Sequence, residues 1–351
     1  MLNRMEPVTH FLTGAVLARA GFNRKAAYAT LAMTLAAEAP DLDTLWGFRG
    51  PIAAFQHHRG WTHTFLGLPI EAAVVVAVVW LVHRWRLKRR PGKSPAAPVR
   101  WWLLYGFCIA ALLSHLLLDW TNNYGLRPFF PFNPRWYAGS FVFIFDPAIF
   151  AVLLIALVAP ALFGLVSSEV GARKPVFRGR GWAIAALIAI VALWGWRIVE
   201  RQDAMQLAQA EDYGAPVTRV FANPYPVNPF RWHVIVETPA SYQLATVDTL
   251  GNTVTTSRES DIFYKPATTL ATLAAKRTWL GEVYLDWSSF PLVTETDTSY
   301  EGLTTVTFRD LRFMYDAAFL KGREDPPLSG KVVLNPDRRI VRMEMDDHVQ
   351  H

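Results

Sequence analysis

The sequence has little that would stabilise a secreted or disulfide-bonded fold. It contains one cysteine, Cys108, so a disulfide within the chain is excluded. Cys108 lies in an apolar run, and we expect it to be a packing residue. The N-terminus lacks a charged stretch followed by an uninterrupted apolar core and a small-residue cleavage site, so we expect no cleavable signal peptide. No repeat of fixed period is visible.

The composition is too apolar for an ordinary soluble protein. Of the 351 residues, 52% are hydrophobic, and the excess lies before residue 200. The net charge of +6 comes from basic residues that stand beside apolar segments. That placement suits membrane topology better than a nucleic-acid groove, so we expect membrane lipids as partners and no nucleic acid.

Four apolar stretches have roughly the length that a bilayer requires, at residues 65–82, 101–118, 147–166 and 182–199. Two shorter helical pieces precede them, at about 7–21 and 26–37. Neither piece would cross a bilayer comfortably, so we expect a re-entrant or tilted hairpin. The sequence therefore predicts a membrane helical bundle of four spans plus an N-terminal helical hairpin.

Basic residues in two connections predict how the spans are oriented. Residues 84–100 include seven Lys or Arg and no acidic residue, and the connection after Val166 carries Arg173, Lys174, Arg178 and Arg180 against Glu169. Short loops rich in Lys and Arg lie in the cytoplasm. Residues 41–63, residues 119–146 and everything after residue 200 are then expected on the extracytoplasmic side of an inner membrane.

The chain changes character near residue 200. Alternating, strand-like runs occur at 232–237, 304–308 and 331–334, separated by turn signals such as Asn223-Pro-Tyr-Pro226. A helical piece is expected near 268–277. We predict two domains: a membrane-embedded helical domain over residues 1–200, and a soluble, mainly β, extracytoplasmic domain over residues 201–351.

The segment 55–63, Phe-Gln-His-His-Arg-Gly-Trp-Thr-His, holds three of the nine histidines. In a regular helix, the side chains of His58 and His63, which are five residues apart, would point in different directions. With Gly60 breaking the segment, a loop could turn both rings toward one point. Because imidazoles are the commonest metal ligands in proteins, we interpret this segment as part of a metal site.

Three other places supply potential ligands. His115 and Asp119 lie four apart, on one helix face within an apolar run, where polar groups mark a site; the alternative is a His–Asp pair that satisfies itself. Asp41 and Asp43 alternate after a helix and could approach one site from an extended backbone, although a helix cap or a solvated turn would also explain them. His10 shares a helix face with the small residues Gly14 and Ala18, which would let another helix come close. By itself, His10 could be incidental.

Together these residues favour a divalent metal centre. Mixed His and Asp ligands suit zinc, and their number would suffice for one to three ions, as in sites that hydrolyse phosphoesters. The predicted catalytic residues are Arg59, which could hold an anionic oxygen, and Asp43. A lipid-headgroup contact is the alternative for Arg59. Membership of the site stays open for His57, Glu71 and Asp146, although a cap at the start of a helix is the simpler account of Asp146.

Four motifs resemble the YdjM/YbcI family of bacterial inner-membrane proteins, which are described as metal-dependent hydrolases. They are His10-x-x-x-Gly14, Pro40-Asp-Leu-Asp43, His58-Arg-Gly-Trp-Thr-His63 and Ser114-His-Leu-Leu-Leu-Asp119 with Thr121 and Gly125. The resemblance covers residues 5–165. It implies metal ligation by His10, Asp41 or Asp43, His58, His63, His115 and Asp119. The family is also distantly similar to zinc-dependent phospholipases C, in which a helical His-x-x-x-Asp binds zinc.

The functional prediction is a membrane-bound, zinc-dependent hydrolase of an ester or phosphoester, with lipid-linked substrates natural at this depth. A metal-activated water would attack the substrate at the outer face of the inner membrane. The alternative is a non-catalytic, metal-stabilised scaffold or regulator that recruits an envelope partner through its β domain. Ion transport ranks last, because the spans lack polar residues apart from Glu71 and the 114–119 end.

Overall fold

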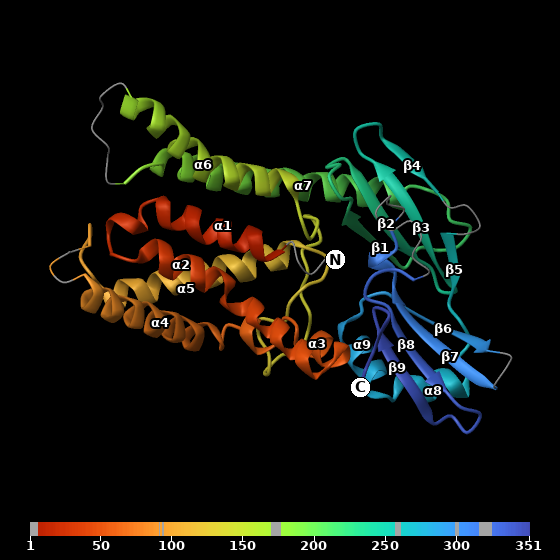
Figure 1. The fold of residues 1–351 in the computed structure, drawn as a ribbon. Helices are drawn as coiled ribbons and strands as arrows, with labels where there is room; N and C mark the ends of the chain where they lie inside the picture. The colour runs from red at the N-terminus through yellow and green to blue at the C-terminus, as the bar shows by residue number, and fades with distance from the viewer. Residues whose placement is uncertain are drawn as a thin grey trace. The chain divides into compact units, whose positions relative to one another are not determined.

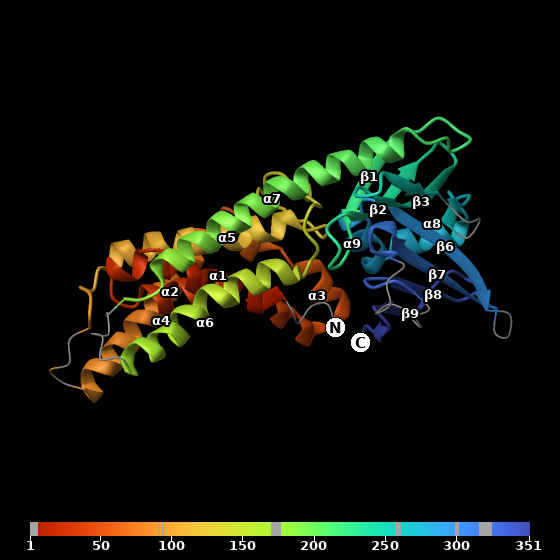
Figure 2. The ribbon, with the colours of Figure 1, turned by 90° about the horizontal axis from the view of Figure 1, so that it is seen from above.

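The computed structural model describes residues 6–90, 92, 95–169, 177–256, 261–298, 302–315 and 325–351. Three of the basic residues used above to orient the chain, Lys93, Arg173 and Lys174, lie outside these ranges. The chain forms two compact units (Figures 1 and 2). The first comprises the residues up to Asp43 and Arg59–Ile198; the second comprises Thr44–His58 and Val199–His351.

The membrane unit contains four helices long and apolar enough to span a bilayer, which confirms the predicted bundle. They are α4 (Leu68–Arg89), α5 (Trp101–Thr121), α6 (Pro147–Glu169) and α7 (Arg180–Gln209), the last of which continues into the second unit. On α4, Ala72, Val75 and Val79 are buried, while Ile70 and Val74 are more than half exposed. Because both faces are apolar, lipid is the natural solvent for the exposed one.

The N-terminal hairpin is present as two short helices, α1 (Glu6–Arg19) and α2 (Ala29–Glu38), with a 3-10 turn, η2 (Phe22–Arg24), between them. α2 packs against α1, α4 and α5, and α1 also contacts α6 (Figure 1). A Cβ atom on Gly14 of α1 would lie 2.6 Å from the carbonyl oxygen of Met33 and 2.8 Å from the Cβ of Ala37. The two helices can approach this closely because residue 14 has no side chain.

Irregular segments connect α2 to α4. They are the 3-10 helix η3 (Ala39–Arg49), the short helix α3 (Pro51–His57) and the 3-10 turn η4 (Trp61–His63). The extended backbone expected at Asp41 and Asp43 is wrong, since both residues lie in η3. A 3-10 helix has about three residues per turn, so side chains two positions apart point in different directions. The two carboxylates consequently meet different partners.

The second unit is mainly β, as predicted, and contains two antiparallel five-stranded sheets. One sheet has the order β1-β2-β3-β4 with β5 also pairing with β3, and the other has the order β10-β9-β8-β7-β6. The bounds of the first sheet are β1 Arg219–Pro224, β2 Arg231–Glu237, β3 Ser241–Asp248, β4 Thr253–Thr255 and β5 Ile262–Tyr264. Those of the second are β6 Pro291–Thr298, β7 Leu303–Asp310, β8 Gly330–Leu334, β9 Ile340–Met345 and β10 His348–Val349. The three predicted strands correspond to β2, β7 and β8.

Helices α8 (Leu270–Lys276) and α9 (Trp279–Trp287) lie between the two sheets in the chain. The sequence predicted α8 but not α9. Ile235 and Tyr242 from the first sheet share a buried cluster with Leu292 of β6 and with Leu311, which begins the 3-10 turn η6 (Leu311–Phe313). This cluster joins the two sheets into one unit.

The segment 44–58 belongs to the β unit although it is remote from it in sequence. The side chain of Gln350 donates to the carbonyl of Arg49 and accepts from the backbone N–H of Ile52, both at 3.0 Å. The indole of Trp279 donates to Gln56 at 3.0 Å, and Phe55 stacks against Tyr284. These contacts hold residues 44–58 in the β unit. In the chain, this segment separates Asp43 from Arg59.

Replacing Gly14 with alanine should destabilise the hairpin, because the new methyl group would meet backbone atoms of α2 that cannot move aside. Overpacking of this kind costs about 1–3 kcal/mol. Gly106 of α5 is a matched control, since a Cβ there meets nothing within 4 Å among the described residues, so Gly106→Ala should be neutral or stabilising by up to about 1 kcal/mol. Thermal unfolding of both purified variants measures the difference, and equal shifts would contradict the close approach.

Candidate metal centre

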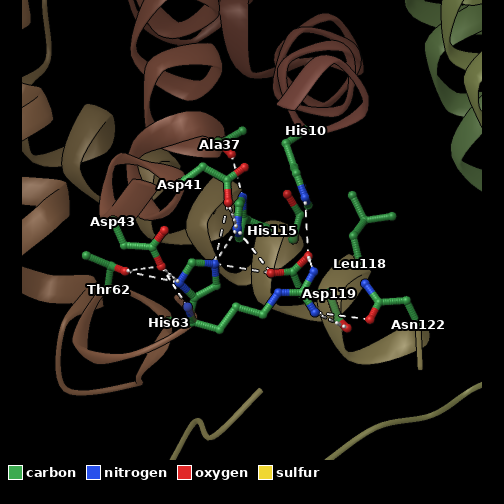
Figure 3. A network of polar contacts seen from close by, with 12 residues as sticks. His10, Ala37, Asp41, Asp43, Thr62, His63, His115, Leu118, Asp119 and Asn122 are labelled. Atoms are coloured by element: carbon green, nitrogen blue, oxygen red, sulfur yellow. Dashed lines mark hydrogen bonds and ion pairs between the residues drawn. The ribbon is translucent and has the colours of Figure 1, made fainter. Parts of the chain in front are cut away.

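Two fully buried imidazoles face each other in the membrane unit (Figure 3). His63 ends η4 and His115 lies on α5, and their Nε2 atoms are 3.1 Å apart. Two neutral imidazoles gain little from such a contact unless one ring donates a proton or both rings share a cation. The surrounding charges therefore decide what the pair does.

Carboxylates from two elements surround this pair of nitrogens. Oδ2 of Asp119 lies 3.2 Å from Nε2 of His63 and 3.4 Å from Nε2 of His115. Oδ1 of Asp41 lies 3.7 Å from both nitrogens. The short distance between His115 and Asp119 confirms that their four-residue spacing places them on one helix face, and the turn η3 brings Asp41 to the same point.

His10 of α1 completes the cluster on another side. Its ring stacks on that of His115 with centroids 3.8 Å apart, and its Nε2 lies 3.4 Å from Oδ1 of Asp119. Gly14 lies one turn along α1 and allows the close approach to α2 described above. Two groups of three ligand atoms result: one from His10, His115 and Asp119, and one from Asp41, His63 and His115. Within each group the atoms lie within 4.8 Å of one another.

The second nitrogen of each central imidazole has its own partner. Nδ1 of His115 lies 2.7 Å from the carbonyl oxygen of Ala37, which can only accept, so Nδ1 carries the proton and the neutral ring directs the lone pair of Nε2 into the cluster. Nδ1 of His63 lies 3.0 Å from the hydroxyl of Thr62 and 3.4 Å from Oδ2 of Asp43. Backbone carbonyls and carboxylates commonly orient metal-binding histidines in this way.

The spacing and the charge both fit a divalent cation. A tetrahedral ion with bonds near 2.0–2.1 Å places its ligand atoms about 3.4 Å apart, and the five distances among the His63, His115, Asp41 and Asp119 atoms given above run from 3.1 to 3.7 Å. With neutral imidazoles, the carboxylates of Asp41, Asp43 and Asp119 against one guanidinium leave two net negative charges in a buried site. One divalent cation would balance them.

The local charges also determine how the metal-free site holds protons. Burial by itself would lower the pKa of His63, but hydrogen bonds to Asp119 and Asp41 and the charge of Asp43 raise it to about 10. Burial would raise the pKa of Asp41, but the charge of His115 and the hydrogen bond to His63 hold it below its usual range. At neutral pH a cation must therefore displace a proton from His63.

The predicted catalytic residue Arg59 is buried within the protein. Its guanidinium donates to Oδ1 of Asp119 at 2.9 Å, to Oδ1 of Asn122 at 3.0 Å and to the carbonyl of Gly125 at 3.0 Å. The ring of Tyr124 packs against the same group. These contacts suit a residue that positions Asp119, and a catalytic role for Arg59 stays a prediction.

Asp43, predicted as both a ligand and a catalytic residue, belongs to neither group of three ligand atoms. Besides its contact with Nδ1 of His63, its Oδ2 accepts from the backbone N–H of Arg59 at 2.7 Å and from Thr62 at 3.5 Å. This geometry fits an orienting carboxylate behind His63. Its bond to Arg59 also closes the base of the segment 44–58.

Four other candidates have different surroundings. His58 caps α3 and His57 stacks on Trp46, and both belong to the β unit. Asp146 caps α6 by accepting from the N–H groups of Ala148 and Ile149, and it accepts from Arg197 at 3.0 Å. Glu71 is half-buried on α4. None of the four is in the two groups of ligand atoms found among the described residues. Ligation by His58 stays a prediction.

No sequence motif singled out Asn122, Thr62 or the carbonyl of Ala37. Thr62 adjoins His63, and Asn122 directly follows the helix that carries His115 and Asp119, so adjacency to a ligand was the available signal. The carbonyl of Ala37 had none, because any backbone position offers the same group.

The part of the chain that contains the polar cluster is similar to known membrane proteins. The profile of the YdjM inner membrane protein family matches residues 5–204, more than half of the chain and the whole of the polar cluster. The chain is 27% identical over 161 residues to the uncharacterized protein YfhP of Bacillus subtilis (strain 168), a match that covers 44% of this chain and 45% of YfhP. The match thus spans less than half of that relative. No solved structure matches the chain. The similarity to zinc-dependent phospholipases C stays a prediction.

Metal content distinguishes ligands from orienting groups. We expect His63→Gln to lose bound metal, because it removes a nitrogen from the centre of the cluster. Asp43→Asn should keep the site but weaken its affinity by about 10–100-fold, as loss of an outer partner does. His348→Gln, at an exposed position of the β unit, is the matched control. Elemental analysis of folded protein after dialysis against graded metal concentrations tests this, and full occupancy in His63→Gln would refute the assignment.

Proposed function

Because the chain belongs to the YdjM inner membrane protein family, we propose that it is a multi-pass membrane hydrolase that depends on divalent metal, zinc in the first place. Its substrates would be esters or phosphoesters, including lipid-linked ones. The observation that carries this proposal is the pair of buried Nε2 atoms of His63 and His115, with the carboxylates of Asp41 and Asp119 around them. Such a set of groups is costly to bury unless a cation balances it.

Each residue has a role that follows from its contacts. His10, Asp41, His63, His115 and Asp119 would hold one to three ions. A divalent cation bound there would lower the pKa of water to near 7 and so supply a nucleophile at neutral pH.

Two further residues would keep these ligands in place. Arg59 would hold Asp119 through Oδ1, which leaves Oδ2 turned toward the imidazoles. Asp43 would orient His63 through Nδ1. Both act through a ligand, which suits their burial.

The surroundings of the site support a lipid-linked substrate. Trp61, Phe65, Phe129 and Phe132 are each close to half exposed or more, and they lie in η4 and in loops next to the ends of α4 and α5. Trp61 packs against Phe130, and Phe65 against Phe129. Exposed aromatic side chains at the ends of spans are typical of the bilayer interface. The candidate metal centre includes His63, two residues after Trp61, and would therefore lie close to the lipid headgroups.

The proposed sidedness places the site and the β unit outside the cytoplasm. Cysteine labelling tests it well, because the natural Cys108 is buried. We expect Phe132→Cys and Leu250→Cys, at positions 86% and 73% exposed, to react with a membrane-impermeant maleimide on intact cells with a permeabilised outer envelope. Ala96→Cys, in the basic connection, should react only after the inner membrane is opened. The reverse pattern would invert the topology.

One observation favours a second function, that of a metal-stabilised scaffold. The ligand atoms are almost wholly buried, and Asp41 is the most exposed ligand with 12% of its side chain accessible. Structural metal sites are closed, whereas catalytic sites keep a position for water or substrate. The β unit would then recruit a partner in the cell envelope.

Hydrolysis assays separate these functions. Purified wild-type protein should hydrolyse a phosphodiester, an ester or a lipid from a broad panel, lose this activity on chelation and regain it with Zn²⁺. His63→Gln should lower the activity by about 100-fold or more, since loss of an outer partner alone costs 10–100-fold, and His348→Gln should leave it intact. Stoichiometric metal without turnover on the panel would favour the scaffold.

A further inference from the structure

A cavity of about 30 Å³ lies within the membrane unit on one side of the metal-binding cluster. It is bounded by α1, α5, the start of α6 and the loop before α6, and His10 and Asp119 form part of its wall. A space that holds one water takes about 10–15 Å³ by the same measure, so this cavity has room for about two.

The wall of the cavity is polar enough to hold water. A buried water needs two to four polar partners. Thr9, Thr121 and Asn122 line the space together with His10 and Asp119. His10 is 3% exposed, and its Nδ1 has no hydrogen-bond partner among the residues that the structure describes. A water in the cavity would satisfy such an atom.

Protein groups already occupy the opposite side of the cluster. Thr62 and Asp43 lie against Nδ1 of His63, and the backbone N–H of Arg59 donates to that same Asp43 carboxylate. Small molecules therefore have more room on the side of His10.

We propose that this cavity is the water-binding site of the metal centre, and that water reaches the ligands from the side of His10 and Asp119. The inference rests on the proposed function and deepens it, because it assigns the reactive side of the cluster. Ile149 of α6, which is 2% exposed, contributes apolar wall to the cavity without belonging to the metal-binding groups. Its size should set how much water the cavity holds.

Radiolytic footprinting of the full chain in lipid nanodiscs tests the hydration without requiring metal. Phe143 lines the cavity and is 7% exposed, while Phe107 lies in the apolar core at 8%. Brief X-ray exposure oxidises side chains next to bound water. We expect Phe143 to be oxidised several-fold faster than Phe107, and equal rates would overturn the proposal.

Two substitutions at Ile149 should move this rate in opposite directions. Ile149→Phe fills the space and should bring the oxidation of Phe143 down to the rate of Phe107, whereas Ile149→Ala enlarges the space and should raise it. Ile155→Phe, at a 53% exposed position of the same helix, should leave the rate unchanged. If Ile149→Phe fails to fold, Ile149→Ala still decides, because an unchanged or slower rate in that variant contradicts a hydrated cavity.

Measurements on protein loaded with Mn²⁺ test whether the water in the cavity lies next to the metal. In D₂O, pulsed electron paramagnetic resonance should detect exchangeable deuterons coupled to the ion in the wild type, and this coupling should fall at least twofold in Ile149→Phe at equal Mn²⁺ content. If the oxidation of Phe143 shows a hydrated cavity but Ile149→Phe leaves the deuteron coupling unchanged, the cavity water is not bound at the metal. That result would overturn the assignment of the water and leave the proposed function in place. Failure of Mn²⁺ and Zn²⁺ to bind would instead overturn the proposed function.

Discussion

The buried carboxylate of Asp119 is the group on which the membrane unit depends most. Its Oδ1 meets the guanidinium of Arg59 and the ring of His10, and its Oδ2 meets Nε2 of His63 and of His115. A carboxylate that is 1% exposed would be very costly in an apolar bundle without these partners. Contacts from α1, from η4 and from the loop after α3 therefore converge on one residue of α5.

The helical framework explains why these partners reach Asp119. The hairpin of α1 and α2 is too short to cross a bilayer, so it packs within the bundle and brings its residues beside the end of α5. The close contact at Gly14 brings α1 against α2, while the carbonyl of Ala37 on α2 sets the ring of His115. The same two helices thus provide a candidate ligand, a group that orients His115 and one wall of the cavity.

The segment 44–58 connects the two units along the chain in an unusual way. Asp43 and Arg59, which flank it, bond to each other within the membrane unit, while Gln56 and the backbone of Arg49 and Ile52 bond within the β unit. Each of the two flanking residues also contacts a residue of the candidate metal centre, Asp43 at His63 and Arg59 at Asp119. The backbone therefore joins the β unit directly to Asp43 and Arg59, the two residues that orient the site, and joins the two units a further time through α7.

The sequence alone determined the four spans, the hairpin and the β character of the tail, and it singled out the candidate ligands that the structure brings together, because apolar runs, alternation and the four-residue spacing of His115 and Asp119 act locally. It could not decide the roles within the site. The 3-10 helix η3 separates Asp41 from Asp43, and Arg59 is buried against Asp119. It also could not show that residues 44–58 fold with the β unit. Those outcomes depend on contacts between residues far apart in the chain, and only the tertiary structure decides which of them form.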